Sequence, residues 1–175
     1  MGTSMYDIVE ATGLSKGGVY GNFKNKEAIA LAAFDHAVET VWQQVRERTS
    51  QVDNYLDKLI EVVAFYKERV LNPPIEGGCP IQNRAAEVGE HLPELKKKVV
   101  VVMDLWIASI VKTLEKGKSK EHVIPDVDSK AFAIQFIATL EGGIMLSQLY
   151  DDVYYYEQNA KQLKVMIESI RQKNS

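Results

Sequence analysis

Apolar residues recur at steps of three and four along most of this chain, the spacing that places side chains on one face of an α-helix. The stripe runs through residues 26–48, 52–71, 93–117 and 131–170. The four consecutive valines at 99–102 alone would suit a strand, but they lie inside a helical pattern more than 20 residues long. The pattern therefore predicts an all-α protein.

Turn-forming residues separate these helices. Residues 72–78 contain two prolines and two glycines, and residues 117–125 form a charged segment that ends in proline. A short helix over 79–88 is predicted to begin at Pro80, because proline suits the first turn of a helix. Residues that can cap the longer helices are Asn25, Ser50 or Asp53, and Asp126 or Asp128.

Two shorter helices are predicted at the start of the chain, over 3–13 and 15–21. Gly13 suits the end of the first helix, where positive φ is needed. Val19 and Phe23 give the second helix one apolar side. Two short helices joined by a turn that contains glycine match the helix-turn-helix, whose second helix enters the major groove of DNA.

The opposite side of the second short helix is polar and cationic. Residues 16–26 include three lysines and no acid. The residues predicted to point outward are Lys16, Gly17, Gly18, Tyr20 and Asn22. The alternative is a pair of capped helices in an ordinary helical domain, with lysines that are merely solvated.

The residues of this segment resemble the signature of the tetracycline-repressor (TetR) family. The matching positions are Ile8, Ala11, Gly13, Leu14, Ser15, Lys16, Gly17, Val19, Tyr20, Phe23, Lys26 and Glu27. The resemblance implies a homodimeric, all-helical transcriptional repressor controlled by a ligand. The positions that it implies for contact with DNA are Thr3, Ser15, Lys16, Gly17, Gly18, Tyr20, Asn22 and Lys26.

We assign these contacts by residue chemistry. Lys16, Lys24 and Lys26 are predicted to contact phosphates, Tyr20 a phosphate or a base, and the paired glycines to allow close approach of backbone. Two features depart from the family pattern. Gly21 and Asn22 stand where relatives often have histidine or an aromatic residue. The family also has an amphipathic helix ahead of the first one here, so we expect the chain to be incomplete at its N-terminus.

The last two helices are predicted to form a dimer interface over 128–170. Residues 131–150 are apolar on most of the helix circumference, which requires cover on more than one side. A heptad-like stripe follows through Leu149, Val153, Tyr156, Ala160, Leu163, Ile167 and Ile170. We favour a four-helix bundle between two chains, as the resemblance also implies, with Gly142 and Gly143 permitting close approach and residues 154–156 at the rim. The alternative is an intramolecular core.

Aromatic, methionine and amide side chains of the central helices predict an effector pocket. Such side chains are typical of an apolar ligand site between helices, although each could equally belong to an ordinary core. The candidates, Cys79 included, are Phe65, Tyr66, Cys79, Met103, Trp106, Gln135 and Phe136. The resemblance implies a cavity enclosed by these helices, and we expect a small, largely apolar effector.

The single cysteine, Cys79, allows two interpretations. A helix N-terminus beside it would lower the thiol pKa and suit an oxidant sensor, whereas a lone cysteine is more often a buried hydrophobe. A nucleophilic enzyme built from Cys79, His91 and Asn83 has no supporting spacing. His36 and His122 are isolated as well, so we expect no catalytic residues, metal or cofactor.

Composition restricts the class of protein further. The 175 residues are 46% hydrophobic and 26% charged, with a net charge of −3. This balance is that of a globular protein and argues against indiscriminate coating of nucleic acid or of an anionic membrane. One cysteine permits no intrachain disulfide, and no run of about 18 apolar residues occurs, so we expect a cytoplasmic protein.

The sequence thus predicts a DNA-binding module over 1–31 and an effector-binding and dimerisation domain over 32–175. The expected function is repression of transcription at a pseudo-palindromic operator, relieved by an effector. The alternative is a helical module that binds a small molecule and no DNA.

Overall fold

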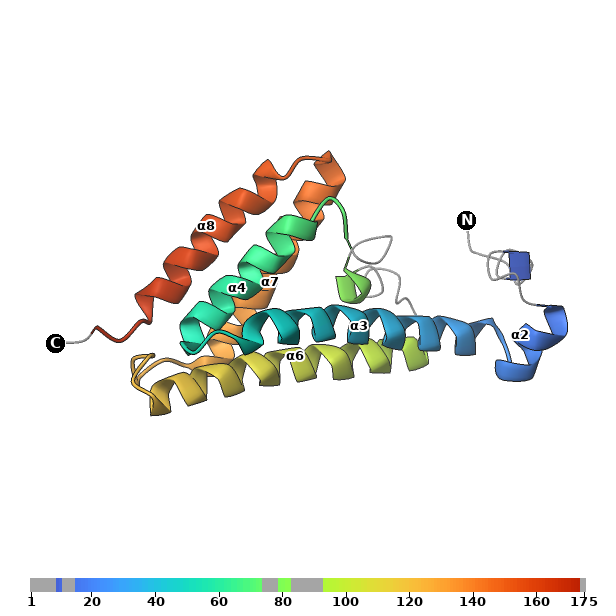
Figure 1. Ribbon diagram of the computed structural model, residues 1–175, viewed down its shortest axis with the longest axis horizontal. Coiled ribbons are helices and arrows are strands. Elements are labelled where there is room, and N and C mark those ends of the chain that lie inside the picture. The colour runs from blue at the N-terminus through green and yellow to red at the C-terminus, as the bar shows by residue number, and fades with distance from the viewer. Residues whose placement is uncertain (1–8, 11–14, 74–78, 83–92, 174–175) are drawn as a thin grey trace. The chain divides into compact units, whose positions relative to one another are not determined.

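The computed structural model describes residues 9–10, 15–73, 79–82 and 93–173. The chain divides into two compact units, Met1–Glu39 and Thr40–Ser175, which are described separately below (Figure 1). Within the described residues every regular element is a helix, apart from one isolated antiparallel bridge between Val123 and Arg171. The predicted all-α fold class is confirmed.

The first unit contains α2 (Lys16–Asn22) and the start of α3 (Lys26–Ser50). The hydroxyl of Ser15 caps α2 by accepting a hydrogen bond from the Gly18 N–H, at 3.0 Å. The side chain of Asn25 accepts from the Ala28 N–H at 2.8 Å, so the predicted cap of α3 is confirmed. Of the first predicted helix, only Val9 and Glu10 lie within the described residues, and both are helical.

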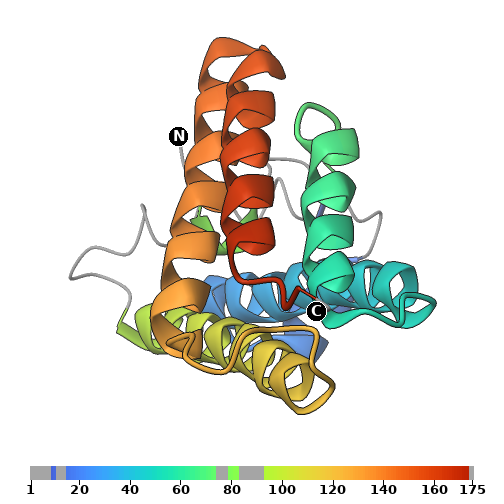
Figure 2. The same cartoon turned by 90° about the vertical axis from the view of Figure 1, so that its left-hand side faces the viewer.

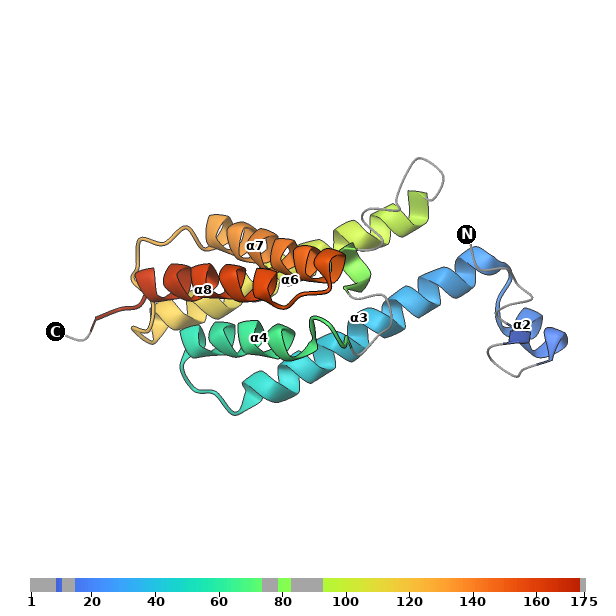
Figure 3. The same ribbon diagram turned by 90° about the horizontal axis from the view of Figure 1, so that it is seen from above.

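The second unit contains the end of α3 and four further long helices, α4 (Tyr55–Arg69), α6 (Pro93–Ser119), α7 (Ser129–Tyr150) and α8 (Tyr154–Ser169). Figures 2 and 3 show α4, α7 and α8 running side by side, with α6 crossing them. Of the predicted short helix over 79–88, residues 80–82 are helical and 83–88 lie outside the described residues.

Capping residues fix where these helices begin. Asp128 caps α7 by accepting from the Lys130 and Ala131 N–H groups. Asn54 caps α4, so the prediction of Ser50 or Asp53 was wrong. Ser50 is instead the last residue of α3, where its hydroxyl donates to the carbonyl of Glu47 within the final turn.

A buried tyrosine joins three helices of the second unit. The hydroxyl of Tyr156 in α8 donates to the carbonyl of Val63 in α4 at 2.8 Å, and its N–H donates to the hydroxyl of Ser147 in α7, also at 2.8 Å. Tyr156 and Ser147 are both 0% exposed. Because each polar group here has a partner, the bonds fix how the three helices pack without a penalty for burial.

This packing corrects the interpretation of the heptad-like stripe. Its residues in α8, from Tyr156 through Ala160, Leu163 and Ile167, are buried inside the single chain. Tyr156 is therefore not at the rim of an interface, whereas Tyr154 is exposed. This part of the stripe has the helical period of a packed seam, but its partners are α4 and α7 of the same chain, whereas Leu149 in α7 is exposed.

The two adjacent glycines of α7 have different surroundings. A Cβ added at Gly143 would lie 2.9 Å from the Cβ of Asn159, so glycine is needed there for α8 to approach. A Cβ at Gly142 would meet no atom within 4 Å. The predicted close approach thus occurs within one chain at Gly143, and Gly142 lies on the uncovered side of the helix.

Helix α7 is the one described helix long and apolar enough, by length and composition, to cross a membrane. Much of it is core, since residues from Phe132 to Ser147 on one side are buried among the other helices. Glu141 also lies in its middle with a buried carboxylate oxygen. We therefore interpret its apolar character as that of a core helix.

Candidate functional site

Helix α2 has one apolar side and one exposed side. Val19 is buried and Phe23 is half-buried, as the pattern predicted. Gly17, Tyr20 and Asn22 are exposed, and 47% of the Tyr20 surface is accessible. An exposed tyrosine on a short helix offers both a ring and a hydroxyl to another surface.

Lysines precede and follow these exposed residues in the sequence. Lys24 and Lys26 are exposed, and Lys16 lies in the first turn of α2, although its side chain is outside the described residues. Thr3 lies outside them as well, and Gly18 is half-buried. With no acid between residues 15 and 26, the segment carries local positive charge suited to phosphate.

Two polar side chains of the segment bind backbone within it. Ser15 uses its hydroxyl oxygen to cap α2, and the Asn22 amide donates to the Gly18 carbonyl at 2.9 Å. Both remain exposed. The amide oxygen and second N–H of Asn22 and the hydroxyl proton of Ser15 remain for contact with another molecule.

The fold itself does not require glycine at position 17. A Cβ added there would come no closer than 3.9 Å to another atom, the Ser15 hydroxyl oxygen. By contrast, a Cβ at Gly117 would lie 2.6 Å from Val123. Glycine in a helix costs about 1 kcal/mol relative to alanine, so Gly17 suits the approach of a surface from outside the chain.

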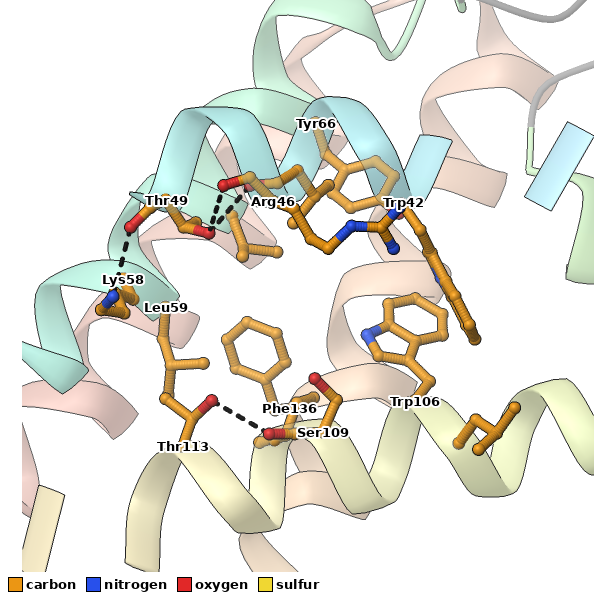
Figure 4. Close-up of a pocket in the computed structure, with 14 residues that line it drawn as sticks. Trp42, Arg46, Thr49, Lys58, Leu59, Tyr66, Trp106, Ser109, Thr113 and Phe136 are labelled. Carbon is orange, nitrogen blue, oxygen red and sulfur yellow. Dashed lines mark hydrogen bonds between the residues drawn. The ribbon is translucent and has the colours of Figure 1, made fainter. Parts of the chain in front are cut away.

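A cavity of about 300 Å³ lies in the second unit between α3, α4, α6 and α7 (Figure 4). This volume is at the lower end of the roughly 300–1,000 Å³ usual for small-molecule sites. The wall is formed by Trp42, Val45, Arg46, Thr49, Lys58, Leu59, Val62, Tyr66, Leu105, Trp106, Ser109, Ile110, Thr113 and Phe136. Apolar and aromatic groups predominate in it, with a few polar groups among them.

The predicted pocket residues fall into three groups. Tyr66, Trp106 and Phe136 line this cavity. Tyr66 also borders a second cavity of about 30 Å³, together with Phe65 and Cys79, which has the volume of about one water molecule. The other two, Met103 and Gln135, line neither of these cavities; Met103 is half-buried in α6, and Gln135 is exposed on α7.

Sequence reasoning missed the contributions of α3, including Trp42 and Arg46, and the polar positions Lys58, Ser109 and Thr113. One signal was available. Trp42 is four residues after Val38 and three before Val45, so it belongs to the same face of the helix and widens the apolar stripe.

A buried acid lies beside the smaller cavity. The Cys79 thiol donates to Glu141 Oε1, with a separation of 3.2 Å, and Gln82 donates to the Glu141 carbonyl. Among the described residues, the other carboxylate oxygen of Glu141 is buried without a partner. Burial raises the pKa of Glu141 from its usual 4.5 to about 7, although the thiol bond opposes the shift.

The same cluster answers the question about Cys79. Burial first, and then the charge of Glu141, raise the pKa of the thiol far above its usual range. The expected lowering by a helix N-terminus is therefore outweighed. The interpretation as a small buried hydrophobe is favoured over that of an oxidant sensor, because the reactive form is the thiolate.

We accordingly predict that Cys79 reacts slowly with iodoacetamide in the folded protein at pH 7. Labelling followed by mass spectrometry is expected to be at least about 100-fold slower than in denaturant, because both the raised pKa and burial suppress the thiolate. Labelling at the rate of an unfolded thiol would contradict this assignment.

In the described part of the chain no three His, Cys, Asp or Glu side chains gather to hold a metal ion.

Comparison with known proteins gives consistent matches over both units. The profile for the N-terminal region of bacterial regulatory proteins of the tetR family matches residues 1–33, and that of the tetracyclin repressor-like C-terminal domain matches residues 55–163. A curated relative, an uncharacterized HTH-type transcriptional regulator in the lacX 3′ region of Lactococcus lactis subsp. lactis, is 24% identical over 174 residues, which are 98% of this chain and 86% of that protein.

Two solved structures extend the likeness. A TetR transcriptional regulator from Chloroflexus aurantiacus is 34% identical, with a TM-score of 0.92 over 98% of this chain and 87% of that one. A TetR-family regulator from Cytophaga hutchinsonii is 30% identical, with a TM-score of 0.89 over 99% of this chain and 86% of that one.

The family matches over both units and the curated HTH-type relative identify a transcriptional regulator rather than an enzyme. The chain belongs to the TetR family of bacterial regulatory proteins. Members of this family bind double-stranded operator DNA.

Proposed function

We propose that the protein is a ligand-responsive repressor that binds a pseudo-palindromic operator as a homodimer and is released by a small effector. The observation that carries the proposal is the combination of an exposed, lysine-flanked α2 with a separate cavity of ligand size. The regulator CifR, a fold neighbour that is 14% identical with a TM-score of 0.82, has been solved with 26-bp double-strand operator DNA. We place the protein in the cytoplasm, where such DNA would be.

In this proposal α2 enters the major groove. Lys16, Lys24 and Lys26 contact phosphates, and Tyr20 contacts a phosphate or a base. Gly17, with Gly18 behind it, lets the helix backbone come close to the DNA. Thr3, Ser15 and Asn22 complete the contacts.

The homodimer would form through the outer side of α7, with α8 beside it. Ile134, Ala138, Met145 and Leu149 are exposed and lie with Gly142 on one side of α7, opposite its buried side. This stripe contains no charge and extends over most of the helix. A second copy of the chain is the occupant that we propose, since a two-fold axis would pair the stripe with itself and provide two copies of α2.

Effector release would act through helix α3. The same helix begins at Lys26 and supplies Trp42, Arg46 and Thr49 to the cavity wall. A ligand that binds best to a conformer with wrongly spaced recognition helices would lower operator affinity through that difference.

The test is selection of a binding site from random duplex with full-length protein, followed by two variants. Tyr20→Ala and Lys26→Ala are each expected to weaken binding to the selected operator about tenfold, because each removes a direct contact. Lys120→Ala, an exposed lysine in the second unit, is the matched control and should bind normally. Unchanged affinity in both α2 variants, with an intact dimer, would count against the proposal.

We also predict opposite effects of Gly17→Ala on stability and on binding. Alanine fits the open space and should stabilise α2 by up to about 1 kcal/mol, yet its methyl group would hold DNA away and lower operator affinity about tenfold. Gly21→Ala, whose added Cβ would meet no atom within 4 Å, provides the control for the helix effect. Thermal unfolding and fluorescence anisotropy measure the two quantities. Equal operator affinity in the wild type and Gly17→Ala would show that close approach is not needed.

The alternative, a helical ligand-binding module without DNA binding, is favoured only by the cavity's location within the second unit. It predicts no salt-sensitive preference for a palindromic site over random duplex.

A further inference from the structure

We propose that the 300 Å³ cavity binds an uncharged, largely apolar molecule that carries a carbonyl or similar acceptor, and that the indole N–H of Trp106 donates a hydrogen bond to this acceptor. The inference rests on the proposed effector role of the cavity and specifies the chemistry of the effector. It adds one hydrogen-bonding group, at a defined place in the wall, to the sequence-based expectation of an apolar ligand.

Trp106 presents a buried polar group to the cavity. The side chain lines the cavity from α6, and only 9% of the residue is exposed. Figure 4 shows its indole nitrogen on the ring edge that faces the cavity, with no hydrogen bond to the other residues drawn. In the described part of the chain no other residue bonds to it either. Because an indole nitrogen is a donor only, the ligand group that would satisfy it is an acceptor.

This buried donor makes the cavity selective. A ligand without an acceptor would separate the N–H from solvent and leave it without a partner, which is unfavourable. A ligand with a carbonyl oxygen at this point would restore the hydrogen bond while the rest of the molecule stays apolar. Ligands of equal apolar area are therefore distinguished by their acceptor.

The hydroxyl groups of the wall are less suited to this contact. The hydroxyl of Thr113 donates to the Ser109 carbonyl at 2.9 Å, and that of Thr49 donates to the Val45 carbonyl at 2.8 Å. Their protons are therefore committed to backbone. Ser109 itself is exposed, so solvent competes with a ligand for its hydroxyl.

The cations of the wall do not favour a charged ligand. The ammonium of Lys58 donates to the Thr49 carbonyl at 3.3 Å and lies 5.6 Å from the centre of the Tyr55 ring. Arg46 is exposed, so its charge is hydrated. A charged ligand group in the enclosed part of the cavity would thus have no buried counter-charge among the lining residues, and burial of an unpaired charge is costly. We therefore infer an uncharged ligand.

Tyr66 is the other aromatic residue of the wall with a hydroxyl. It borders both cavities, and burial, followed by the neighbouring Cys79 and Glu141, raises the pKa of its hydroxyl well above the usual value. Cys79 borders the smaller cavity. We therefore assign the Tyr66 hydroxyl to the surroundings of the smaller cavity, and this assignment makes it the control in the test below.

The remaining wall determines the body of the ligand. Leu59, Ile110 and Phe136 are buried and contribute aliphatic and aromatic surface to the cavity. A flat or compact apolar group would cover this surface and gain the free energy of its burial. At about 300 Å³ the space fits a body of one or two rings or a short alkyl chain.

The test uses pairs of probes that differ only in the acceptor. Each pair is a methyl ketone and its isopropenyl analogue, in which a CH₂ group replaces the carbonyl oxygen, on a 2-naphthyl, a 4-tert-butylphenyl or a hexyl body. The carboxylate of each body tests the inferred absence of charge. By calorimetry we expect at least one ketone to bind, and to bind more tightly than the carboxylate of the same body.

Variants locate the hydrogen bond. Trp106→Phe, which removes the N–H and keeps an aromatic ring, should lower the ratio of ketone affinity to isopropenyl affinity about tenfold. Comparing this ratio between proteins cancels the different hydrophobicity of the two probes and the loss of ring area. Tyr66→Phe removes the other hydroxyl and should leave the ratio unchanged.

NMR gives a readout in the unaltered protein. Both tryptophans of the sequence, Trp42 and Trp106, are in the cavity wall, so two indole N–H signals report on it. The signal of Trp106 is identified as the one that remains in Trp42→Phe. The proton resonance of Trp106 should move downfield when the ketone binds and not when the isopropenyl analogue binds.

Four results would overturn the inference: an unchanged affinity ratio in Trp106→Phe, no downfield movement with the ketone, tighter binding of a carboxylate than of its ketone, or no binding of any probe. Operator binding, measured in parallel, separates this failure from failure of the proposed function. Release of the operator by the isopropenyl probe as readily as by the ketone would retain the repressor and exclude the acceptor. Ketone binding by a protein without operator preference would retain the cavity assignment and exclude the repressor.

Discussion

Replacing Met145 with aspartate should convert the protein from a dimer to a monomer and abolish operator binding. Met145 is 49% exposed in the single chain and lies in the middle of the uncharged stripe of α7. In a two-fold interface each substitution would appear twice, and an unpaired buried charge costs about 2–5 kcal/mol. We therefore expect the dimer to weaken at least about 100-fold by analytical ultracentrifugation.

Operator affinity should fall with the dimer, because one recognition helix reads only one half-site. Val101→Asp, which places the same charge at an exposed apolar position of α6, is the control and should remain dimeric. Unfolding temperature distinguishes a lost interface from a damaged fold. A Met145→Asp protein that remains dimeric would exclude the α7 stripe as the interface.

Replacing Glu141 with glutamine should stabilise the protein at pH 8 by up to about 3 kcal/mol, with little effect at pH 5. Burial raises the pKa of Glu141 in the folded protein to about 7, compared with its usual 4.5. The unfolded chain therefore loses this proton first as the pH rises. The contribution of Glu141 to stability is therefore greatest below pH 4.5, falls between about 4.5 and 7, and stays lower above that range, with each pKa unit equal to about 1.4 kcal/mol.

Glutamine has no proton to lose, so Glu141→Gln should flatten this part of the pH profile. Urea denaturation at pH 5, 6, 7 and 8 measures the free energy of unfolding directly. The control is Glu94→Gln, because Glu94 is exposed and pairs with Lys97 on the surface. If the wild-type protein instead gains free energy of unfolding relative to Glu141→Gln between pH 5 and pH 8, the assigned burial is contradicted.

Local sequence signals were sufficient for the helices and most of their ends. Ser15, Asn25 and Asp128 each cap the helix predicted for them, because a cap depends on side chain and backbone within a few residues. The wrong cap predicted for α4 is also a local error, of one residue from Asp53 to Asn54. Asp53 and Asn54 are both good caps, and the choice between neighbours depends on the exact start of the helix.

The partners of an apolar face could not be predicted from its period. The stripe through Tyr156 and Leu163 indicated a packed side, but the same period serves a contact within a chain and one between chains. Gly142 and Gly143 show the same limit, since only the structure reveals that one of them faces Asn159. For Cys79, burial beside Glu141 outweighed the local effect of a helix start.

The lining of the cavity could be predicted from the sequence only in part. Three of the seven candidates, Tyr66, Trp106 and Phe136, line it, because aromatic side chains on neighbouring helices tend to point into shared space. The polar part of its wall includes Arg46 and Lys58, on α3 and α4. These two side chains come to the same cavity through tertiary packing, which cannot be predicted from the helical period of the sequence.

The most direct test of this account is the affinity of the protein for its selected operator compared with a duplex carrying about five additional base pairs between the half-sites. That insertion turns one half-site through roughly half a helical turn of about 10 base pairs, so that two copies of α2 held by one dimer cannot reach both. The account predicts a loss of affinity of at least about 100-fold, while the isolated half-sites are unaltered. Equal affinity for the two duplexes would contradict it.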